Sequence, residues 1–229
     1  MRFLWDLIKK LLILFIGSSV LAVVLYRYVP VYVTPLMVIR AVEQKKAGKP
    51  MKMKHDWVPM DKISQNMVQA VVASEDNLFL EHKGFDFKQI EKAIEEAKSG
   101  KRNRGASTIT QQTAKNVFLW NDGGWFRKGL EAYFTVLIEL LWSKERIMEV
   151  YLNSIEMGDG LYGVEAVAQE NFGKKAVKLT KSEAALIAAT LPNPLKFSSA
   201  HPSSYMRKRQ KQILSLMNKI AKVEMGNQK

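Results

Sequence analysis

A long apolar run near the amino end carries no charged residue. The run extends from Leu11 to Tyr26, follows Lys9 and Lys10, and is continued by further apolar residues after Arg27. A helix needs about 20 predominantly apolar residues to cross the hydrocarbon core of a bilayer. Flanking aromatic residues suit the two interfaces of a membrane. The sequence therefore predicts one transmembrane helix over residues 11–29, which ties the chain to a membrane.

The remaining segments are predicted relative to this helix. Residues 1–10 are expected to be a cytoplasmic tail, residues 30–59 an irregular linker along the membrane surface, and residues 60–229 one domain. A cleaved signal peptide is the alternative for the first segment, but no small-x-small site follows the apolar run. Basic residues after the run outnumber those before it, so the chain alone does not decide its orientation.

The overall charge is strongly positive. The 229 residues include 35 Lys and Arg against 22 Asp and Glu, which gives a formal net charge of +13. Such a balance suits nucleic acid, an anionic membrane surface or an anionic substrate, and does not choose among them. Cysteine is absent, which excludes disulfides, thiol nucleophiles and thiolate metal sites.

Apolar residues recur at helical spacing from Met60 onward, and no sustained alternation predicts a sheet. Capping signals agree with helices, because Thr180 and Glu183 have capping-box spacing and Asp86 precedes another apolar pattern. The glycine-rich stretch 157–163 is expected to be a structural turn. It lacks the lysine of a P-loop, and no strand precedes it. The predicted fold is therefore mainly α.

A basic amphipathic helix is predicted from His201 onward, with Met206, Ile213, Met217 and Ile220 on its apolar side. Two interpretations remain for this helix. It contacts anionic lipid, or it closes the domain with its basic side in solvent.

Glu75 follows apolar residues at helical spacing. Asp61 is expected to cap this helix, and the pattern breaks at the polar residues from Ser74 to Asn77. A carboxylate at a helix carboxyl end faces unsatisfied carbonyl groups, so the pKa of Glu75 is predicted to rise toward the range of a general base or acid. The alternative is that Glu75 and Asp76 form a solvated helix end.

A basic segment precedes the next predicted helix. Gly100 is expected to end one helix, residues 101–105 to form a basic loop, and Thr108 with Gln111 to form a capping box. Free amides at a helix start beside basic side chains predict an anion site. The same spacing occurs wherever a helix simply starts, so it does not by itself establish a ligand.

The clearest predicted helix runs from Trp125 to Trp142. Leu130, Phe134, Leu137 and Ile138 belong to one core-facing stripe of this helix. Lys128 and Glu131 lie three residues apart on a neighbouring face. They are either an intrahelical ion pair or part of a working site, and the base precedes the acid, which is the weaker orientation for such a pair.

Four segments in order resemble the motifs of the peptidoglycan glycosyltransferases, the enzymes that polymerise lipid II into glycan strands. The resemblance covers roughly Met60 to Pro194. Ala106, where many members have a second glycine, is a small departure. The segments are Glu75-Asp76-x-x-Phe79-x-x-His82-x-Gly84-x-Asp86, Gly105-Ala106-Ser107-Thr108-Ile109-Thr110-Gln111-Gln112, Arg127-Lys128-x-x-Glu131 and Lys144-Glu145-Arg146-Ile147-Met148-Glu149-Val150-Tyr151-Leu152-Asn153.

The resemblance implies roles for individual residues. Glu75 is the expected base for the 4-hydroxyl of the acceptor, and Glu131 is expected to assist by orienting Lys128 or by sharing a divalent cation, Mg²⁺ or Mn²⁺, with the substrate pyrophosphate. The amides after Ser107 are expected to help hold that pyrophosphate. The residues expected to bind substrate are Asp76, Phe79, His82, Ser107, Thr108, Gln111, Gln112, Lys115, Arg127 and Lys128.

The resemblance also implies a lysozyme-like helical domain outside the plasma (inner) membrane, with the amino terminus in the cytoplasm. Its expected partners are lipid II, the growing glycan strand, membrane lipid and other wall-synthesis or division proteins, without nucleic acid. Neither Ser-x-x-Lys nor Lys-Thr-Gly occurs in the sequence, so no transpeptidase activity is expected. The alternatives are a lysozyme-like lytic enzyme and an inactive membrane-anchored scaffold.

Overall fold

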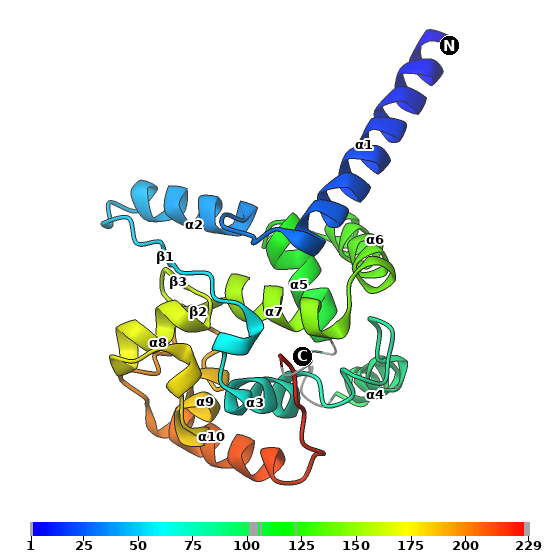
Figure 1. Cartoon of the computed structure of the whole chain (residues 1–229). Helices are drawn as coiled ribbons and strands as arrows, with labels where there is room; N and C mark the ends of the chain where they lie inside the picture. The colour runs from blue at the N-terminus through cyan, green and yellow to red at the C-terminus, as the bar shows by residue number, and fades with distance from the viewer. Residues whose placement is uncertain (1, 101–104, 106, 122, 227–229) are drawn as a thin grey trace.

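The computed structural model describes residues 2–100, 105, 107–121 and 123–226. Helices make up most of this part of the chain, and its strands are short (Figure 1). The prediction of a mainly α protein is confirmed, whereas its likeness to lysozyme stays a prediction. Lys101 to Arg104, four residues of the predicted basic loop, lie outside the described residues.

The helices are connected by short segments and 3₁₀ turns. They are α1 (Arg2–Tyr28), α2 (Pro35–Lys46), α3 (Gln65–Glu75), α4 (Phe87–Lys98), α5 (Ile109–Phe118), α6 (Trp125–Leu141), α7 (Lys144–Ser154), α8 (Val164–Phe172), α9 (Lys181–Ala188) and α10 (Ser204–Met217), with 3₁₀ turns at Met60–Lys62 and Ala176–Lys178.

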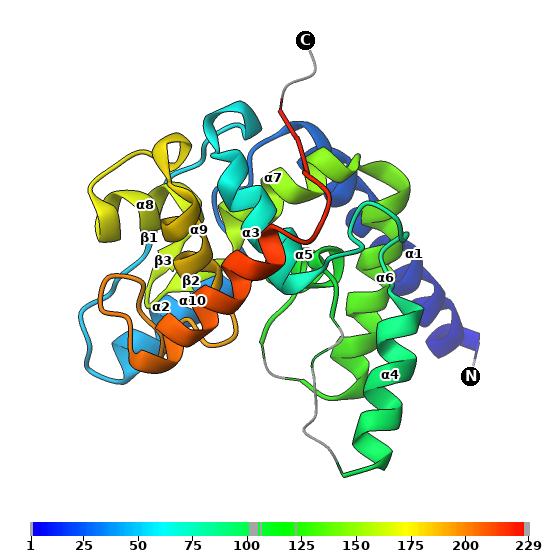
Figure 2. The same cartoon turned by 90° about the horizontal axis from the view of Figure 1, so that it is seen from below.

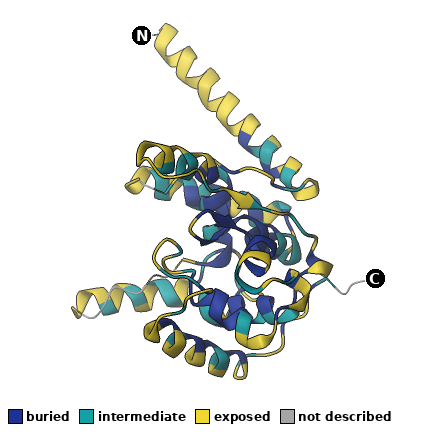
Figure 3. Ribbon diagram, turned by 90° about the vertical axis from the view of Figure 1, so that its left-hand side faces the viewer, coloured by how far each residue is buried: buried dark blue, intermediate teal, exposed yellow. Residues whose placement is uncertain are grey.

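Helix α1 projects from the rest of the molecule, and its amino-terminal part is exposed on all sides (Figures 1 and 3). It is long and apolar enough to cross a membrane, in agreement with the predicted span. The predicted tail over residues 1–10 and the predicted span over residues 11–29 belong to one continuous helix, so the boundary between them stays a prediction. The helix already begins at Arg2, because no proline or glycine separates Arg2 from Leu11.

The carboxyl end of α1 is fastened to the domain. The hydroxyl groups of Ser19 and Tyr133 on α6 lie 2.7 Å apart, within hydrogen-bond distance. The guanidinium of Arg146 on α7 donates to the carbonyl oxygen of Tyr26 at 2.8 Å. That oxygen belongs to the last turn of α1, where carbonyl groups lack partners within the helix. The predicted membrane helix therefore continues into the core rather than ending at a free hinge.

The segment predicted to be an irregular linker contains helix α2. Thr34 caps this helix by accepting from the amide of Met37, and Pro35 occupies its first position. A Thr N-cap followed by proline is a helix-start signal, so the sequence did hold a sign of this helix. Helix α2 buries Leu36 and Met37 and packs against α5. Residues 30–59 are therefore part of the folded unit.

Two groups of helices build the core. Helices α5, α6 and α7 pack together on the side of the molecule from which α1 projects, and α2 lies against α5 (Figure 1). Helices α3, α9 and α10 form the second group, farther from α1. Buried residues of both groups form one continuous core (Figure 3). Helix α4 has no buried residue and lies along one side of the molecule (Figure 2).

A small sheet lies beside α8. Its strands β1 (Lys54–His55), β3 (Leu161–Tyr162) and β2 (Glu156–Gly158) occur in that spatial order, with β1 parallel and β2 antiparallel to β3. The predicted turn is a hairpin between β2 and β3. Gly160 adopts a φ of +67°, and a Cβ there would come within 2.4 Å of the carbonyl oxygen of Lys52. Only glycine fits this close approach, which gives the glycine-rich stretch a structural role.

Most predicted caps are confirmed, and one is wrong. Asp86 caps α4, and both predicted capping boxes, at Thr108 and Thr180, are formed. Asp61, however, lies in a 3₁₀ turn, and Ser64 caps α3 by accepting from the amide of Asn66. The apolar pattern misled the prediction because Ile63 is buried ahead of the helix.

The carboxyl-terminal helix has a narrower extent than predicted. Helix α10 begins at Ser204, with Ser203 as its cap, and ends before Ile220. It buries Met206, Ile213 and Met217 against α3 and α9. Its apolar side is therefore covered by protein, which supports the domain-closing interpretation over contact with lipid.

Candidate active site

Glu75 is the last residue of α3 and lies half-buried between the two helix groups. Its Oε2 accepts a hydrogen bond from Nε2 of Gln112 on α5 at 3.1 Å. The amide of Gln112 is held in turn by the hydroxyl of Tyr151 on α7, which donates to Oε1 at 3.2 Å. Tyr151 is fully buried. The Glu75 carboxylate is therefore fixed by a chain of hydrogen bonds that begins in the core.

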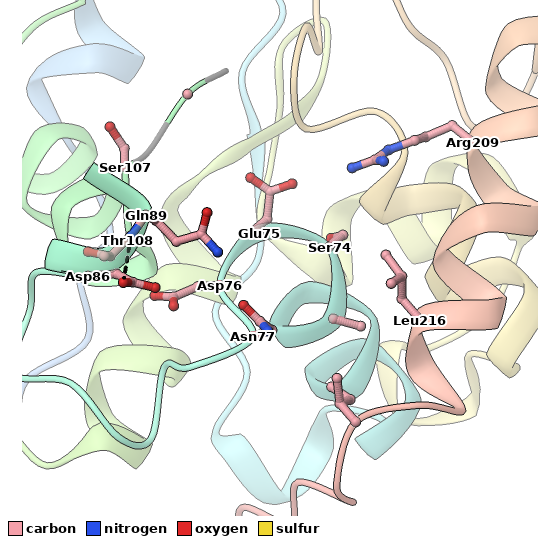
Figure 4. A pocket seen from close by; sticks show the side chains of 13 residues that line it. Ser74, Glu75, Asp76, Asn77, Asp86, Gln89, Ser107, Thr108, Arg209 and Leu216 are labelled. Carbon is pink, nitrogen blue, oxygen red and sulfur yellow. Dashed lines mark hydrogen bonds between the residues drawn. The ribbon is translucent and has the colours of Figure 1, made fainter. Parts of the chain in front are cut away.

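A cavity of about 240 Å³ opens in front of Glu75 (Figure 4). Its walls come from the end of α3, the starts of α4 and α5, and α10. Arg209 on α10 points into it from the wall opposite Asp86 and Thr108. The walls are rich in polar groups, which can bind a ligand through hydrogen bonds. The other lining residues are Ala73, Ser74, Asp76, Asn77, Gln89, Gly105, Ser107, Leu216 and Ile220.

Burial raises the pKa of the Glu75 carboxyl, and the nearby negative charge of Asp76 adds to that rise. The hydrogen bond from Gln112 and the positive charge of Arg209 oppose it. The predicted direction is confirmed, but its leading cause is removal from water rather than the helix end. A carboxylate with a raised pKa accepts a proton more readily, as a general base requires.

Asp76 has a different role from its neighbour. Its carboxylate is buried and accepts from Nε2 of His82 at 2.9 Å and from the amide of Ile109 at 3.0 Å. The second contact lies at the start of α5, where a negative charge is favoured. Asp76 therefore joins the loop after α3 to α5 and holds Glu75 beside Gln112.

The expected anion site at the start of α5 is already filled by the protein. The amide of Ile109 donates to Asp76, the amide of Gln111 donates to the hydroxyl of Thr108 at 3.2 Å, and the amide of Thr108 donates to Oε1 of Gln111 at 3.0 Å. These three amides therefore already donate within the fold, and the expectation that the amides after Ser107 hold pyrophosphate stays a prediction.

Three residues predicted to bind substrate have packing or capping roles. The Phe79 side chain is fully buried, with Nζ of Lys144 4.7 Å from the centre of its ring. The His82 ring is hydrogen-bonded to the Asp76 carboxylate, and the side-chain oxygen of Gln111 accepts from the backbone amide of Thr108 in the capping box. In this arrangement Phe79 has no exposed surface for a ligand to contact. Ser107 and Thr108 do line the Glu75 cavity, so their predicted contact with substrate stays a prediction.

A cationic cluster lies on the other side of Gln112. Arg127 donates to one oxygen of Glu131 at 2.8 Å, and Lys128 donates to the other. Burial lowers the pKa of the Lys115 ammonium, Glu131 opposes this, and Arg127 and Lys128 lower it further. Positive groups gathered this closely repel one another, so an anion at the cluster would stabilise it.

Glu131 is poorly suited to hold the predicted divalent cation. It is buried, and both of its oxygens already accept from Arg127 and Lys128. Among the described residues, no three His, Asp or Glu side chains gather around one point, whereas a Mg²⁺ ion shared with a pyrophosphate needs only one or two carboxylates, so the predicted cation stays a prediction. The arrangement instead fits the other predicted role, in which Glu131 orients Lys128.

Comparison with known proteins shows the family of the chain. Residues 43–218 match the family described as transglycosylase. A protein of Bacteroides thetaiotaomicron named biosynthetic peptidoglycan transglycosylase is 63% identical over 214 residues, which cover 93% of this chain and 86% of the relative. Proteins of the same name from Caulobacter vibrioides and Bdellovibrio bacteriovorus are both 53% identical, over 93% and 94% of this chain and 90% and 88% of their own lengths.

The chain belongs to the transglycosylase family. The matched region extends past Pro194, where the resemblance found in the sequence ends, and includes α10 of this transglycosylase. Reasoning from the sequence missed Arg209 because it treated α10 only as an amphipathic helix. It also missed that Gln112 supports Glu75. The polar residues within α5, a helix that buries apolar side chains, were a signal that could have indicated this support.

Proposed function

We propose that this transglycosylase polymerises lipid II into linear glycan strands. The observation that carries the proposal is the position of Gln112, which holds Glu75 on one side and lines a second cavity with Lys115 on the other. A basic carboxylate and a group of cations thus lie on the two sides of one side chain. This arrangement suits transfer of a sugar away from a pyrophosphate.

In the proposed reaction, Glu75 takes the proton of the 4-hydroxyl on the acceptor lipid II. The freed oxygen attacks C1 of the donor sugar, and the bond from C1 to the pyrophosphate breaks. The electron pair leaves with undecaprenyl pyrophosphate, and displacement from the opposite face inverts the α-linkage to β. Lys115, Arg127 and Lys128 would stabilise the departing charge. A strong general acid is not needed, because pyrophosphate is already a good leaving group.

The two alternatives fit less well. A lytic enzyme cleaves a bond between sugars, whose leaving oxygen needs a proton from an acid, and has no use for clustered cations. An inactive scaffold has no need of a half-buried glutamate held by Gln112. The deciding assay uses purified full-length protein in detergent with labelled lipid II and Mg²⁺. Gel separation of polymer from monomer is expected to show long strands, whereas shortened strands or unchanged lipid II would support the alternatives.

We further propose that α1 crosses the plasma membrane with Met1 in the cytoplasm, so that the domain meets lipid II on the outer face. A fusion of alkaline phosphatase after Lys229 is expected to be active, because this enzyme needs an oxidising compartment for its disulfides. A cytoplasmic reporter at the same position is expected to be inactive. The opposite pair of results would reverse the proposed orientation.

Arg209→Gln is expected to shift the acid limb of the rate profile to higher pH. Besides Arg209, the groups that act on Glu75 are Gln112 on α5 and its two neighbours in the chain, Ser74 and Asp76. Loss of the Arg209 charge raises the pKa of Glu75 further, so the ionised base is lost at a higher pH. Polymerisation rates measured from pH 4 to 9 would reveal the shift.

The matched control for Arg209→Gln is Lys208→Gln, which removes a neighbouring exposed charge from the same helix. An unchanged acid limb in Arg209→Gln, with the control also unchanged, would mean that Arg209 does not tune Glu75.

A further inference from the structure

A third cavity, of about 140 Å³, lies between the β2–β3 hairpin and the segment that joins α9 to α10. Residues 158–159 line it from the hairpin, and residues 194–198 line it from the joining segment. We call it the Phe197 cavity. Pro194 also lines the cavity that contains Lys115, so the two cavities are neighbours on either side of this proline. The other residues that line the Phe197 cavity are Lys52, Leu161 and Asn171.

The Phe197 ring gives this cavity an aromatic surface that is held in place. The Tyr205 ring of α10 stacks on it, with the ring centres 5.4 Å apart and 28° between the ring planes. Tyr205 is 53% exposed, so the stacked pair lies at the surface rather than in the core. The C–H groups on the flat faces of sugar rings pack favourably against aromatic rings, whose faces carry partial negative charge. The Phe197 cavity thus has the apolar part of a sugar-binding site.

Polar side chains near the Phe197 ring can supply hydrogen bonds to a sugar. Asp159, Lys196 and Ser198 all line the cavity. Asp159 and Lys196 are exposed, so a ligand can reach their charged ends. A carboxylate accepts from hydroxyl and amide N–H groups, and an ammonium donates to hydroxyl and carbonyl oxygens. An aromatic surface with a few polar groups beside it is typical of a site for a small polar ligand.

The position of the Phe197 cavity fits a sugar strand attached to the donor pyrophosphate. The proposed function places that pyrophosphate at Lys115, and the lipid on one end of it stays in the membrane that α1 crosses. The sugars on its other end therefore extend away from α1. The β2–β3 hairpin lies farther from α1 than α2 does (Figure 1). A strand that leaves the Lys115 cavity in this direction passes Pro194 and reaches Phe197.

We propose that the Phe197 cavity is a distal binding site for the growing glycan strand, which takes sugars of the donor beyond its first disaccharide. This inference rests on the proposed polymerase function. Phe197 would contact the face of a sugar ring, and Asp159 and Lys196 would bond its hydroxyl and acetamido groups. The site would hold the strand between successive additions, so a long donor would bind more tightly than lipid II.

Transfer from two donors of different length tests the inference. One donor is lipid II and the other is a lipid-linked strand of several disaccharides, and the full-length protein in detergent transfers both to labelled lipid II. Phe197→Leu keeps an apolar side chain but removes the flat ring. It is expected to raise the KM of the long donor about 5–10-fold relative to that of lipid II, on the scale of one aromatic contact. Phe197→Tyr, which keeps the ring, is expected to restore the wild-type ratio.

Lys196→Gln is expected to raise the same ratio. Its matched control is Lys178→Gln, which removes an exposed lysine from the 3₁₀ turn after α8. Equal changes of KM for the two donors in Phe197→Leu, or no change for the long donor, would overturn the inference.

Binding of labelled, peptide-free glycan strands to the same preparations is measured separately and is expected to be weaker for Phe197→Leu than for wild type. A wild type that binds these strands without polymerising lipid II would contradict the proposed function alone. Normal polymerisation by wild type, without any effect of donor length in Phe197→Leu, would contradict the distal site alone.

Discussion

Glu75→Gln is expected to lower the rate of glycan polymerisation by about 10²–10⁴-fold, the usual contribution of a general base. Glutamine keeps the shape of the side chain and removes its basicity. Binding of lipid II is expected to survive, because the contacts of Asp76 that position the loop do not involve Glu75. Single-turnover polymerisation and lipid II binding, measured on the same purified variant, would separate the two effects.

Substitutions of two other glutamates serve as comparisons for Glu75→Gln. Glu81→Gln changes an exposed glutamate in the loop after α3 and is expected to keep the wild-type rate. Glu131→Gln weakens the hold on Arg127 and Lys128 and is expected to leave a residual rate above that of Glu75→Gln. If Glu75→Gln polymerises as fast as Glu131→Gln with the same rise toward alkaline pH, the base has been assigned to the wrong glutamate.

Lys128→Ala is expected to lower kcat by about 10²–10³-fold, as does loss of one preorganised group that faces developing charge. The Lys128 side chain is 43% exposed although its partner Glu131 is 4% exposed, so solvent reaches a side chain whose ammonium is held by a buried carboxylate. Removal of this charge would leave the departing pyrophosphate less stabilised. The measurement is the rate at saturating lipid II.

Lys92→Ala on the exposed helix α4 is the matched control for Lys128→Ala and is expected to leave kcat unchanged. Lys128→Arg is not expected to restore the rate, because a planar guanidinium does not replace a compact ammonium held at one point. A near-normal kcat for Lys128→Ala would remove Lys128 from the proposed mechanism.

The sequence by itself determined most of the helices, although not α2, and most of the predicted caps. The apolar run from Leu11 predicted the helix that can cross a membrane, and the Thr108 and Thr180 capping boxes were read correctly. These features depend on residues within one or two turns of each other, so their signals are local. The sequence also indicated Glu75 and the pair Lys128 and Glu131, because the family motifs that contain these residues occur along the chain in the expected order.

Only the tertiary structure decided what surrounds those residues. Burial, rather than the helix end, is the leading cause of the raised pKa of Glu75, and Asp76 occupies the amide at the start of α5 that the sequence offered to pyrophosphate. Arg209 and Arg40 reach the two cavities from helices outside the motifs. Such contacts join residues far apart in the chain and depend on how the helices pack, for which the sequence carries no short-range pattern.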